Sequence, residues 1–376
     1  MQARSGMTEN GYDVGGDNST HFTIRIHIMQ SSRFVTCLLL TAVLTGCPGN
    51  SDCGKIVLPH HAFRLDALNS PYDDWNSCDP EGHWTLGRDL EVLFSSNRAT
   101  KGGTFDLTPM YLSLDGNDST FEVHGSANHS LDSLLTYINS PKDELGPSFW
   151  FPREALRVDQ DSAGSTPQAF VFAQGDSGAH DLRVMVAEPT GDTLDDFEAL
   201  SDWRYGKTPA LRDVRLPEPI NSTFDEGYAT WTPRVGRILF HSNRSGTYRI
   251  WEATVPLDAH GPFKWIQNAM PAGVTVRQIP ELSSTDGQER CPYLVGNILY
   301  FVSDRSGGQG GLDVYRSKWD GTTWTVPENI GPGVNSPSDE YRPFALPSGN
   351  GRQGALIFSS NRPGGAGGFD LYMIGM

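Results

Sequence analysis

The stretch that decides the fold is LIFSSNRPGGAGGFDLYMI, residues 356–374, because a close copy, LYFVSDRSGGQGGLDVYRS, already occurs at residues 299–317. Three further copies are VLFSSNRATKGGTFDL from Val92, FVFAQGDSGAHDLRVM from Phe170 and ILFHSNRSGTYRIWEA from Ile238. Each copy is an apolar run, a polar cluster with Asn or Asp, glycine-rich residues and a second apolar run. This pattern predicts a β-hairpin, since Asn, Asp and Gly tolerate the backbone angles of a tight turn.

A second phrase precedes each hairpin and shows that the repeat is longer than one turn. It reads LNSPYDD from Leu68, INSPKDE from Ile138, INSTFDE from Ile220, VNSPSDE from Val334 and, in a degenerate form, LSSTDGQE from Leu282. The alternation gives a unit of about 50–80 residues: an acidic linker, a short strand, a hairpin and a fourth segment. We therefore predict an all-β fold, a β-propeller of five four-stranded blades, or six if the long second unit hides another.

The two ends of this repeat region complement each other. The last unit stops after its third strand at FDLYMIGM, while the run at residues 55–68, KIVLPHHAFRLDAL, has no hairpin of its own. We expect this N-terminal strand to complete the last blade and close the ring, which leaves no long exposed sheet edge. The propeller domain is predicted at residues 55–376. Two segments, SLDSLLTYI from Ser130 and DTLDDFEALSDW from Asp192, are the helix candidates.

The N-terminal region has the pattern of a secreted lipoprotein. Residues 29–46 combine an early positive charge, a short apolar stretch and a small-residue ending, which together predict a signal peptide. Leu44-Thr45-Gly46-Cys47 resembles the lipobox of bacterial lipoproteins, so Cys47 is expected to carry the lipid, with residues 47–54 as a tether. Residues 1–28 then precede the natural start and are interpreted as a non-native or mis-annotated start. The alternative is an ordinary secreted protein in which Cys47 pairs.

Charge and cysteine usage exclude several classes of partner. The formal charge of −16, with no basic stripe, argues against nucleic acid. In an oxidising compartment Cys53 and Cys78 could form a disulfide, which leaves Cys291 free. Neither the cysteine nor the histidine spacing matches a metal site, and the glycine runs lack the context of a phosphate loop. We expect no metal and no cofactor.

The hairpin phrase, with SNR or SDR, a glycine-rich turn and FDLY or LDVY, resembles the WD40-like β-propeller repeat of the TolB type. The resemblance covers the chain from about Leu68 onward, lacks the Arg in the second unit, and includes no peptidoglycan-binding domain. It implies that the repeated polar residues are structural signatures. In the hairpins these are Asn97, Arg98, Asp106, Asn243, Arg244, Asp304, Arg305, Asp313, Asn361, Arg362 and Asp370; in the linkers they are Asp143, Glu144, Asp225, Glu226, Asp339 and Glu340.

Two catalytic interpretations compete with this structural one. The repeated acids could be acid-base pairs or calcium ligands, but acids copied into every blade are explained more simply by pairing with the repeated arginines. The GDSG segment at residues 175–178 is similar to a serine-protease nucleophile motif, yet it occupies a hairpin turn, which explains Ser177 without catalysis.

The sequence therefore favours a monomeric, lipid-anchored binding or scaffolding module of the bacterial cell envelope. We expect an outer-membrane lipoprotein facing the periplasm or the surface, with a protein, peptide or glycan partner. The alternative is a propeller hydrolase that acts on glycans or peptides with carboxylates in the central channel. A fold does not determine a function, so the choice between the two depends on the site. An acid pair that occurs in one blade and faces the channel would favour the enzyme.

Overall fold

The computed structural model describes residues 57–79, 90–116, 121–150, 169–187, 211–232, 236–255, 273–346 and 353–376. The chain divides into Met1–Gly54 and a compact unit, Lys55–Met376, and the fold given below is that of the second unit. The predicted signal peptide, the lipidation site Cys47, the tether and the early start all lie outside the described residues.

The described residues form five four-stranded antiparallel sheets, which confirms the all-β propeller with five blades. Blade 1 contains β2 (Asp74–Cys78), β3 (Leu90–Ser96), β4 (Asp106–Gly116) and β5 (Phe121–Ala127). Blade 2 contains β6 (Asp143–Trp150), β7 (Ala169–Asp176), β8 (Ala179–Ala187) and β9 (Leu211–Arg215). Blade 3 contains β10 (Glu226–Thr232), β11 (Arg237–Ser242), β12 (Arg249–Thr254) and β13 (Thr275–Gln278). Blade 4 contains β14 (Glu289–Val295), β15 (Ile298–Ser303), β16 (Asp313–Lys318) and β17 (Glu328–Asn329).

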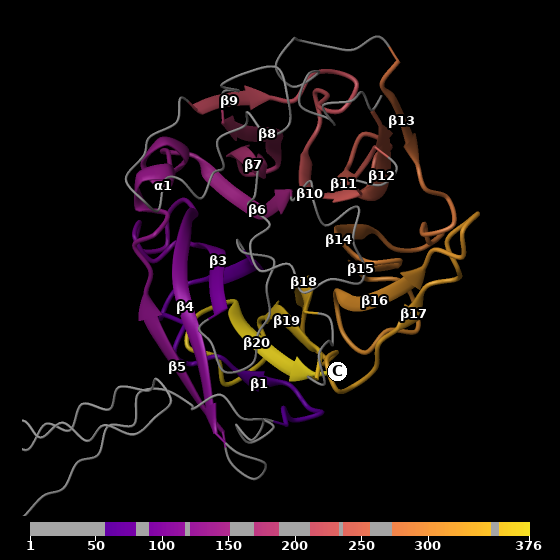
Figure 1. Ribbon diagram of the computed structural model, residues 1–376. Helices are drawn as coiled ribbons and strands as arrows, with labels where there is room; N and C mark the ends of the chain where they lie inside the picture. Colours follow the sequence, from indigo (N-terminus) through magenta and orange to yellow (C-terminus); the bar gives the residue numbers. More distant parts are fainter. Residues whose placement is uncertain are drawn as a thin grey trace, which may run out of the picture. The chain divides into compact units, whose positions relative to one another are not determined.

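Blade 5 is assembled from both ends of this unit, as the sequence predicted. It contains β18 (Glu340–Leu346), β19 (Ala355–Ser360), β20 (Asp370–Gly375) and the short N-terminal β1 (Phe63–Arg64). Figure 1 shows β1 beside β20, and their register pairs Phe63 with Met373. Leu58 and Leu65, on either side of β1, are fully buried. The N-terminal strand therefore closes the ring with apolar side chains as well as with backbone hydrogen bonds.

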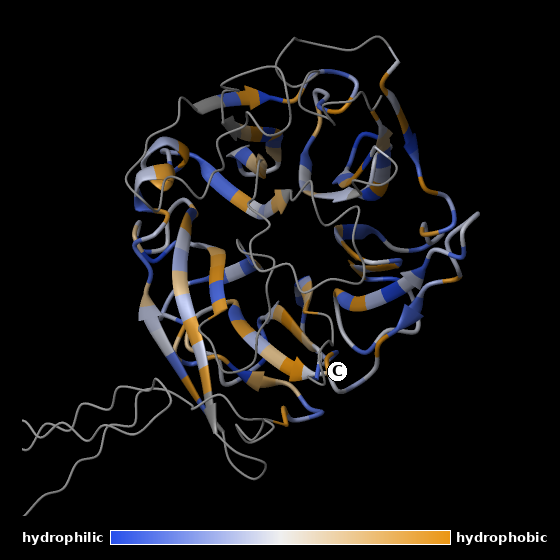
Figure 2. Cartoon of the chain, viewed as in Figure 1, coloured by the Kyte–Doolittle hydropathy of each residue, from blue (hydrophilic) through white to orange (hydrophobic). Residues whose placement is uncertain are grey.

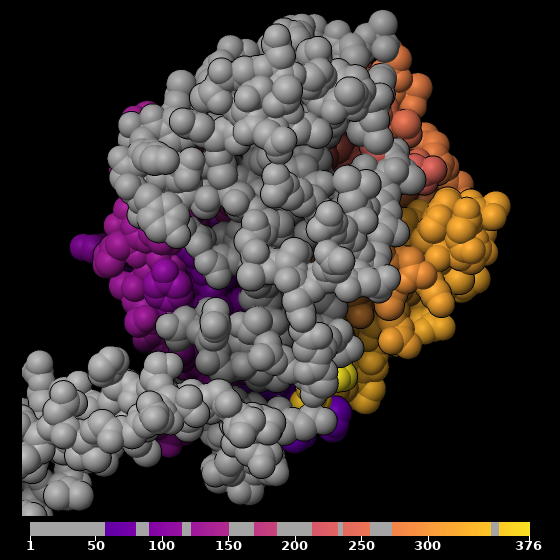
Figure 3. Space-filling view, in the orientation of Figure 1, coloured from indigo at the N-terminus to yellow at the C-terminus, as the bar shows by residue number. Residues whose placement is uncertain are grey.

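The first strand of each blade lines the central axis. These innermost strands, β2, β6, β10, β14 and β18, each contact the innermost strands of the neighbouring blades, and Figure 1 shows the blades arranged around them. Figure 3 shows the described parts of blades 1 and 4 on opposite sides of the ring. Residues that start an innermost strand are consequently brought together from all five blades.

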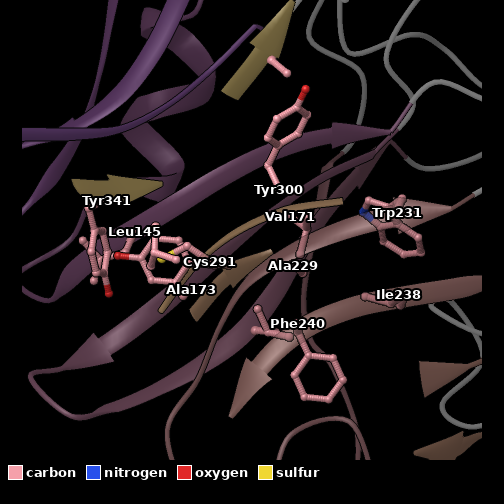
Figure 4. Packing of buried hydrophobic residues seen from close by; sticks show 14 of the residues in the cluster. Leu145, Val171, Ala173, Ala229, Trp231, Ile238, Phe240, Cys291, Tyr300 and Tyr341 are labelled. Carbon is pink, nitrogen blue, oxygen red and sulfur yellow. The ribbon is translucent and has the colours of Figure 1, made fainter. Parts of the chain in front are cut away.

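The core is built from the second strand of each blade, where hydrophilic and hydrophobic positions mix along the strands (Figure 2). The phenylalanine of every hairpin phrase is at most 1% exposed: Phe94, Phe172, Phe240, Phe301 and Phe358. Figure 4 shows Phe240 among the apolar side chains of one such cluster. The repeated phrase thus places one aromatic ring in the centre of each sheet.

Two smaller expectations have different outcomes. The segment from Ser130 contains the helix α1 (Asp132–Ile138), which buries Leu134, Leu135 and Ile138, whereas the second helix candidate lies outside the described residues. Cys78 and Cys291 are buried free thiols. Cys53 lies outside the described residues, so its disulfide with Cys78 stays a prediction.

Candidate functional site

Every blade begins with one carboxylate that has no exposed surface: Asp74, Glu144, Glu226, Glu289 and Glu340. In four blades the arginine of the hairpin phrase binds it, at 2.6 Å for Arg98–Asp74, 3.0 Å for Arg244–Glu226, 3.0 Å for Arg305–Glu289 and 2.9 Å for Arg362–Glu340. The same guanidinium donates to a linker carbonyl, as Arg362 does to Val334 O at 2.6 Å. Each acid is therefore a buried, fully bonded structural group that no substrate reaches.

Blade 2 lacks the arginine and stabilises its carboxyl group differently. Gln174 donates to Glu144 at 2.9 Å, and the Ser140 hydroxyl donates to it at 2.6 Å. Burial raises the pKa of Glu144 to about 7, although these hydrogen bonds oppose the shift. Without an adjacent cation, burial favours the neutral acid.

In every blade except blade 4, where Gln288 precedes Glu289, the acid before the buried carboxylate holds neighbouring blades together. Asp143, Asp225 and Asp339 accept backbone N–H groups from the preceding hairpin, at 3.0 Å from Phe105, 2.7 Å from His180 and 2.9 Å from Leu312. The Asn or Asp of the hairpin phrase accepts the backbone N–H at the same linker position, as shown by Asn97, Asn243, Asp304 and Asn361 at 2.7–3.0 Å. These signature residues are positioned at the seams between blades.

The remaining signature acids and the glycines stabilise the hairpin turns. Asp370 accepts the Ala366 N–H at 2.7 Å, and Asp313 accepts the Asn329 amide at 3.0 Å. Asp106 is the corresponding acid of blade 1, and burial raises its pKa. A side chain at Gly367 would collide with the backbone of Tyr72 in the next linker. The glycine-rich phrase is repeated because each turn must pack closely against the following blade.

Sequence reasoning missed two parts of this network. The linker asparagines bind both backbone groups of one residue in the preceding blade, as Asn335 does with Val314 N at 2.8 Å and Val314 O at 3.0 Å; the others are Asn69, Asn139 and Asn221. Their recurrence in the linker phrase was the available signal. Glu289 was also missed, because the fourth linker is one residue longer between its serine and its acid.

A set of side chains whose chemistry varies from one part of the ring to another lies just inside these linkers. We call it the axial ring: Trp75, Phe105, His180, Tyr248, Arg290, Tyr341 and Phe369. In blades 1 and 5 it is aromatic, since Trp75 lies 5.0 Å from Phe105, 5.1 Å from Phe369 and 5.3 Å from Tyr341 between ring centroids. Tyr341 is largely buried, and Figure 4 shows it near Cys291 and Leu145. Trp75, Phe105 and Phe369 are half-buried and keep some surface exposed.

The opposite half of the axial ring is polar. The Arg290 guanidinium lies 3.7 Å from the Tyr248 ring centroid, and the Tyr248 hydroxyl donates to Asp225. His180 lies 2.8 Å from Asp225 and 3.7 Å from Asp143. Burial opposes ionisation of Asp225, but its hydrogen bonds with His180 and Tyr248 hold its pKa well below its usual range. The ring therefore presents aromatic surface on one side and charged groups on the other.

Other kinds of site were sought in the described part of the chain. There, no group of three or more His, Cys, Asp and Glu side chains is arranged to hold a metal ion. Among the same residues, no helix is long and apolar enough to cross a bilayer.

Comparison with known proteins gives one kind of match. No family model matches the chain, and no curated protein matches it. Among solved structures the chain is similar to one described as "putative TolB from Agrobacterium tumefaciens". The two are 13% identical, with a TM-score of 0.33, over 84% of this chain and 97% of that one.

Proposed function

We propose that this protein is a lipid-anchored binding module of the bacterial cell envelope, held in the outer membrane through Cys47. The axial ring binds a protein, peptide or glycan partner. The anchor is supported by the signal-like residues 29–46 and the Leu-Thr-Gly-Cys sequence that ends at Cys47. Binding through the ring is supported by the described residues of the propeller.

The observation that carries this proposal is the contrast between repeated and unrepeated polar groups. The repeated carboxylates are buried and bonded within the blades, as Glu340 is to Arg362, Ser336 and Ser360. The axial ring differs from blade to blade and keeps Trp75, Phe105 and Arg290 partly exposed. A rigid frame that presents varied, half-exposed side chains is suited to recognition.

The chemistry of the axial ring restricts its partner. Exposed aromatic faces stack on a sugar ring or cover an apolar side chain, and Arg290 adds a hydrogen-bond donor at the polar side. The net charge of −16 favours a neutral or basic partner. Steering by that charge would make association slower as salt increases.

The experiment is a binding screen against peptide and glycan arrays, followed by titration of each hit. Trp75→Ala and Phe369→Ala should weaken binding at least about tenfold, as the loss of an aromatic anchor does. Val326→Ala is the matched control, because Val326 is 83% exposed on blade 4, away from the ring. A hit that binds all three variants equally would show that the axial ring is not the binding surface.

The anchor is tested separately. Cys47→Ser should move the protein from the membrane fraction to the soluble fraction, and mass spectrometry of the wild-type protein should find an acylated Cys47 at its N-terminus. A mature protein that begins elsewhere would contradict the anchor and leave the binding proposal standing.

The second candidate, a hydrolase of glycans or peptides, has one observation in its favour. Glu144 has a pKa of about 7, which suits a general acid near neutral pH. However, Glu144 has no exposed surface and therefore contacts no substrate in this conformation. Turnover of a glycosidase or peptidase substrate that Glu144→Gln abolishes, with the fold intact, would favour this candidate.

A further inference from the structure

Arg342 occupies a special position on the axis. It lies in β18, two residues after the buried Glu340, and has no exposed surface. The innermost strand of every blade has an irregular register at this point. The residue there has a positive φ in each case: Asn76, Gly146, Tyr228, Cys291 and Arg342. The five blades thus place five different residues at one level of the axis.

The Arg342 guanidinium has no carboxylate partner within the described part of the chain, unlike the arginines of the hairpin phrases. Its Nη2 donates to Pro147 O at 3.0 Å and its Nη1 donates weakly to Pro292 O at 3.4 Å. The rings of Tyr228 and Tyr293 lie 5.6 and 5.7 Å from its central carbon. Its Nε is buried without a hydrogen-bond partner.

The titratable neighbours do not balance this charge. Burial raises the pKa of the Cys291 thiol to about 12 and raises the pKa of Tyr228 well above its usual range. Burial also lowers the pKa of His241 to about 3. All three groups are neutral at neutral pH, so none of them offsets the positive charge of Arg342. A buried, unbalanced charge is strongly unfavourable unless a counter-ion joins it.

A second unsatisfied group lies beside the same residues. The Asn76 side chain is fully buried; its amide lies within reach of the Tyr228 hydroxyl, and its carbonyl oxygen has no hydrogen-bond partner. The Asn76 backbone N–H donates to Ser359 in blade 5 at 3.2 Å. Burial raises the pKa of Tyr228, and both the charge of Arg342 and a hydrogen bond with Asn76 oppose that rise. Buried polar groups are almost always satisfied in native proteins. The Arg342 Nε–H and the remaining Asn76 amide N–H are donors at one level of the axis, and a partner that accepts hydrogen bonds would satisfy both.

We propose that Arg342 and Asn76 form a binding site for a small planar carboxylate on the axis of the propeller. The free Nε–H and a neighbouring Nη–H of a guanidinium point the same way and match the two oxygens of one carboxylate. The Asn76 amide supplies a further donor. The carbonyls of Pro147 and Pro292 accept hydrogen bonds from the two terminal nitrogens and hold the guanidinium in place. This site is independent of the axial ring and of the partner proposed above.

The test uses formate as the probe and compares it with chloride at equal ionic strength. Saturation-transfer NMR should show magnetisation passing from the wild-type protein to the formate proton, with saturable dependence on concentration. The melting temperature should rise by about 2 °C in excess formate relative to chloride, since a ligand that binds only the folded state stabilises it.

Two variants and one control decide the outcome. Arg342→Gln should lose both the NMR signal and the formate-dependent rise. Asn76→Asp should also lose them and melt higher than the wild-type protein in chloride, because the new carboxylate replaces the anion. Arg316→Gln, which removes a surface arginine of blade 4 that pairs with Glu328 at 3.2 Å, should keep the full response.

The proposal is overturned if wild-type protein shows no formate signal, which would mean that water satisfies Arg342. It is also overturned if Arg342→Gln or Asn76→Asp responds to formate as the wild-type protein does. If Arg342→Gln does not fold, Asn76→Asp alone still separates these results.

Discussion

Blades 2 and 5 form the same four-stranded sheet, although each lacks a feature that the other has. Blade 5 is assembled from both ends of the propeller unit, yet it keeps the complete pair of Glu340 and Arg362. Blade 2 is continuous in order along the chain, yet it lacks the arginine, and Gln174, at the position of the serine in the other hairpin phrases, donates to Glu144 instead. Both blades nevertheless form four-stranded sheets with the same strand order. A blade can therefore form without a continuous chain, as blade 5 does, or without the buried ion pair, as blade 2 does.

The difference between the two blades appears in the ionisation of their buried acids. Burial raises the pKa of Glu340 only modestly, because hydrogen bonds from Ser336 and the charge of Arg362 oppose it. The pKa of Glu144 rises to about 7, where no arginine is present. The arginine thus favours the charged form of the acid in its blade, whereas the neutral Gln174 of blade 2 leaves burial to dominate the pKa of Glu144.

Deleting residues 57–66 should have the largest effect, because it removes the strand that completes blade 5. The deletion takes away Leu58 and Leu65, both fully buried, and exposes the edge of β20. At about 2–5 kcal/mol for each buried leucine, the free energy of unfolding should fall by at least about 4 kcal/mol. Urea unfolding measures the loss, and deletion of residues 48–54 is the control. Unchanged unfolding and solubility after the first deletion would show that β1 is not needed for closure.

Breaking the ion pair of blade 5 should have the next largest effect. Arg362→Ala leaves Glu340 buried without its cation, so the folded protein must either bury an unpaired charge or protonate the acid, and we expect a loss of about 3–5 kcal/mol in urea unfolding. The matched change in blade 2, Gln174→Ala, removes a neutral donor and should cost about 1–2 kcal/mol. Equal losses in the two variants would mean that the arginine adds nothing beyond a hydrogen bond.

The fold was predictable because its information is repeated. Five copies of the hairpin phrase predicted five blades, with six left open by the long second unit, and the unmatched run before Leu68 indicated the strand that closes the ring. Exceptions to the repeat were harder to interpret. In the fourth linker the acid is displaced to Glu289, and in blade 3 Arg249 replaces the hairpin aspartate and donates to Glu289 at 2.7 Å. This exchange of charges across a seam is visible only when the two blades are placed side by side.

The candidate sites were not predictable for the same reason. Apart from Phe105 and Phe369, which share one position of the hairpin phrase, the axial ring and the Arg342 site consist of residues that differ between blades, so a search for similarity does not find them. Their position depends on the start of each innermost strand and on the irregular register that gives Asn76 and Arg342 a positive φ. Only the five-fold arrangement brings these residues together from distant parts of the sequence.

The free energy of unfolding should depend on pH through Glu144. Measuring this dependence tests whether the buried acid of blade 2 differs in ionisation from that of blade 5. The pKa of Glu144 is about 7 in the folded state and 4.5 in its ordinary environment, so the folded protein binds more protons between these values. The contribution of Glu144 to stability is therefore greatest below about pH 4.5 and decreases as the pH rises to about 7. Relative to Glu144→Gln, the wild-type protein should lose about 2–3 kcal/mol between pH 4.5 and pH 8. A constant difference across this range would contradict the raised pKa.

The smallest effect should come from Ser177, although GDSG is the segment most suggestive of catalysis. Ser177 and Gly178 form the two-residue turn between β7 and β8, where Asp176 pairs with Ala179. Ser177 is exposed and Gly178 has a φ of 79°. Ser177→Ala should change stability by less than about 0.5 kcal/mol, whereas Gly178→Ala should cost about 1 kcal/mol because alanine disfavours a positive φ. In blade 5 the equivalent turn is longer, so the short turn of blade 2 depends more on its glycine. If Ser177→Ala instead abolished a measurable hydrolysis without altering unfolding, the serine would be a nucleophile and blade 2 would carry a function that the other blades lack.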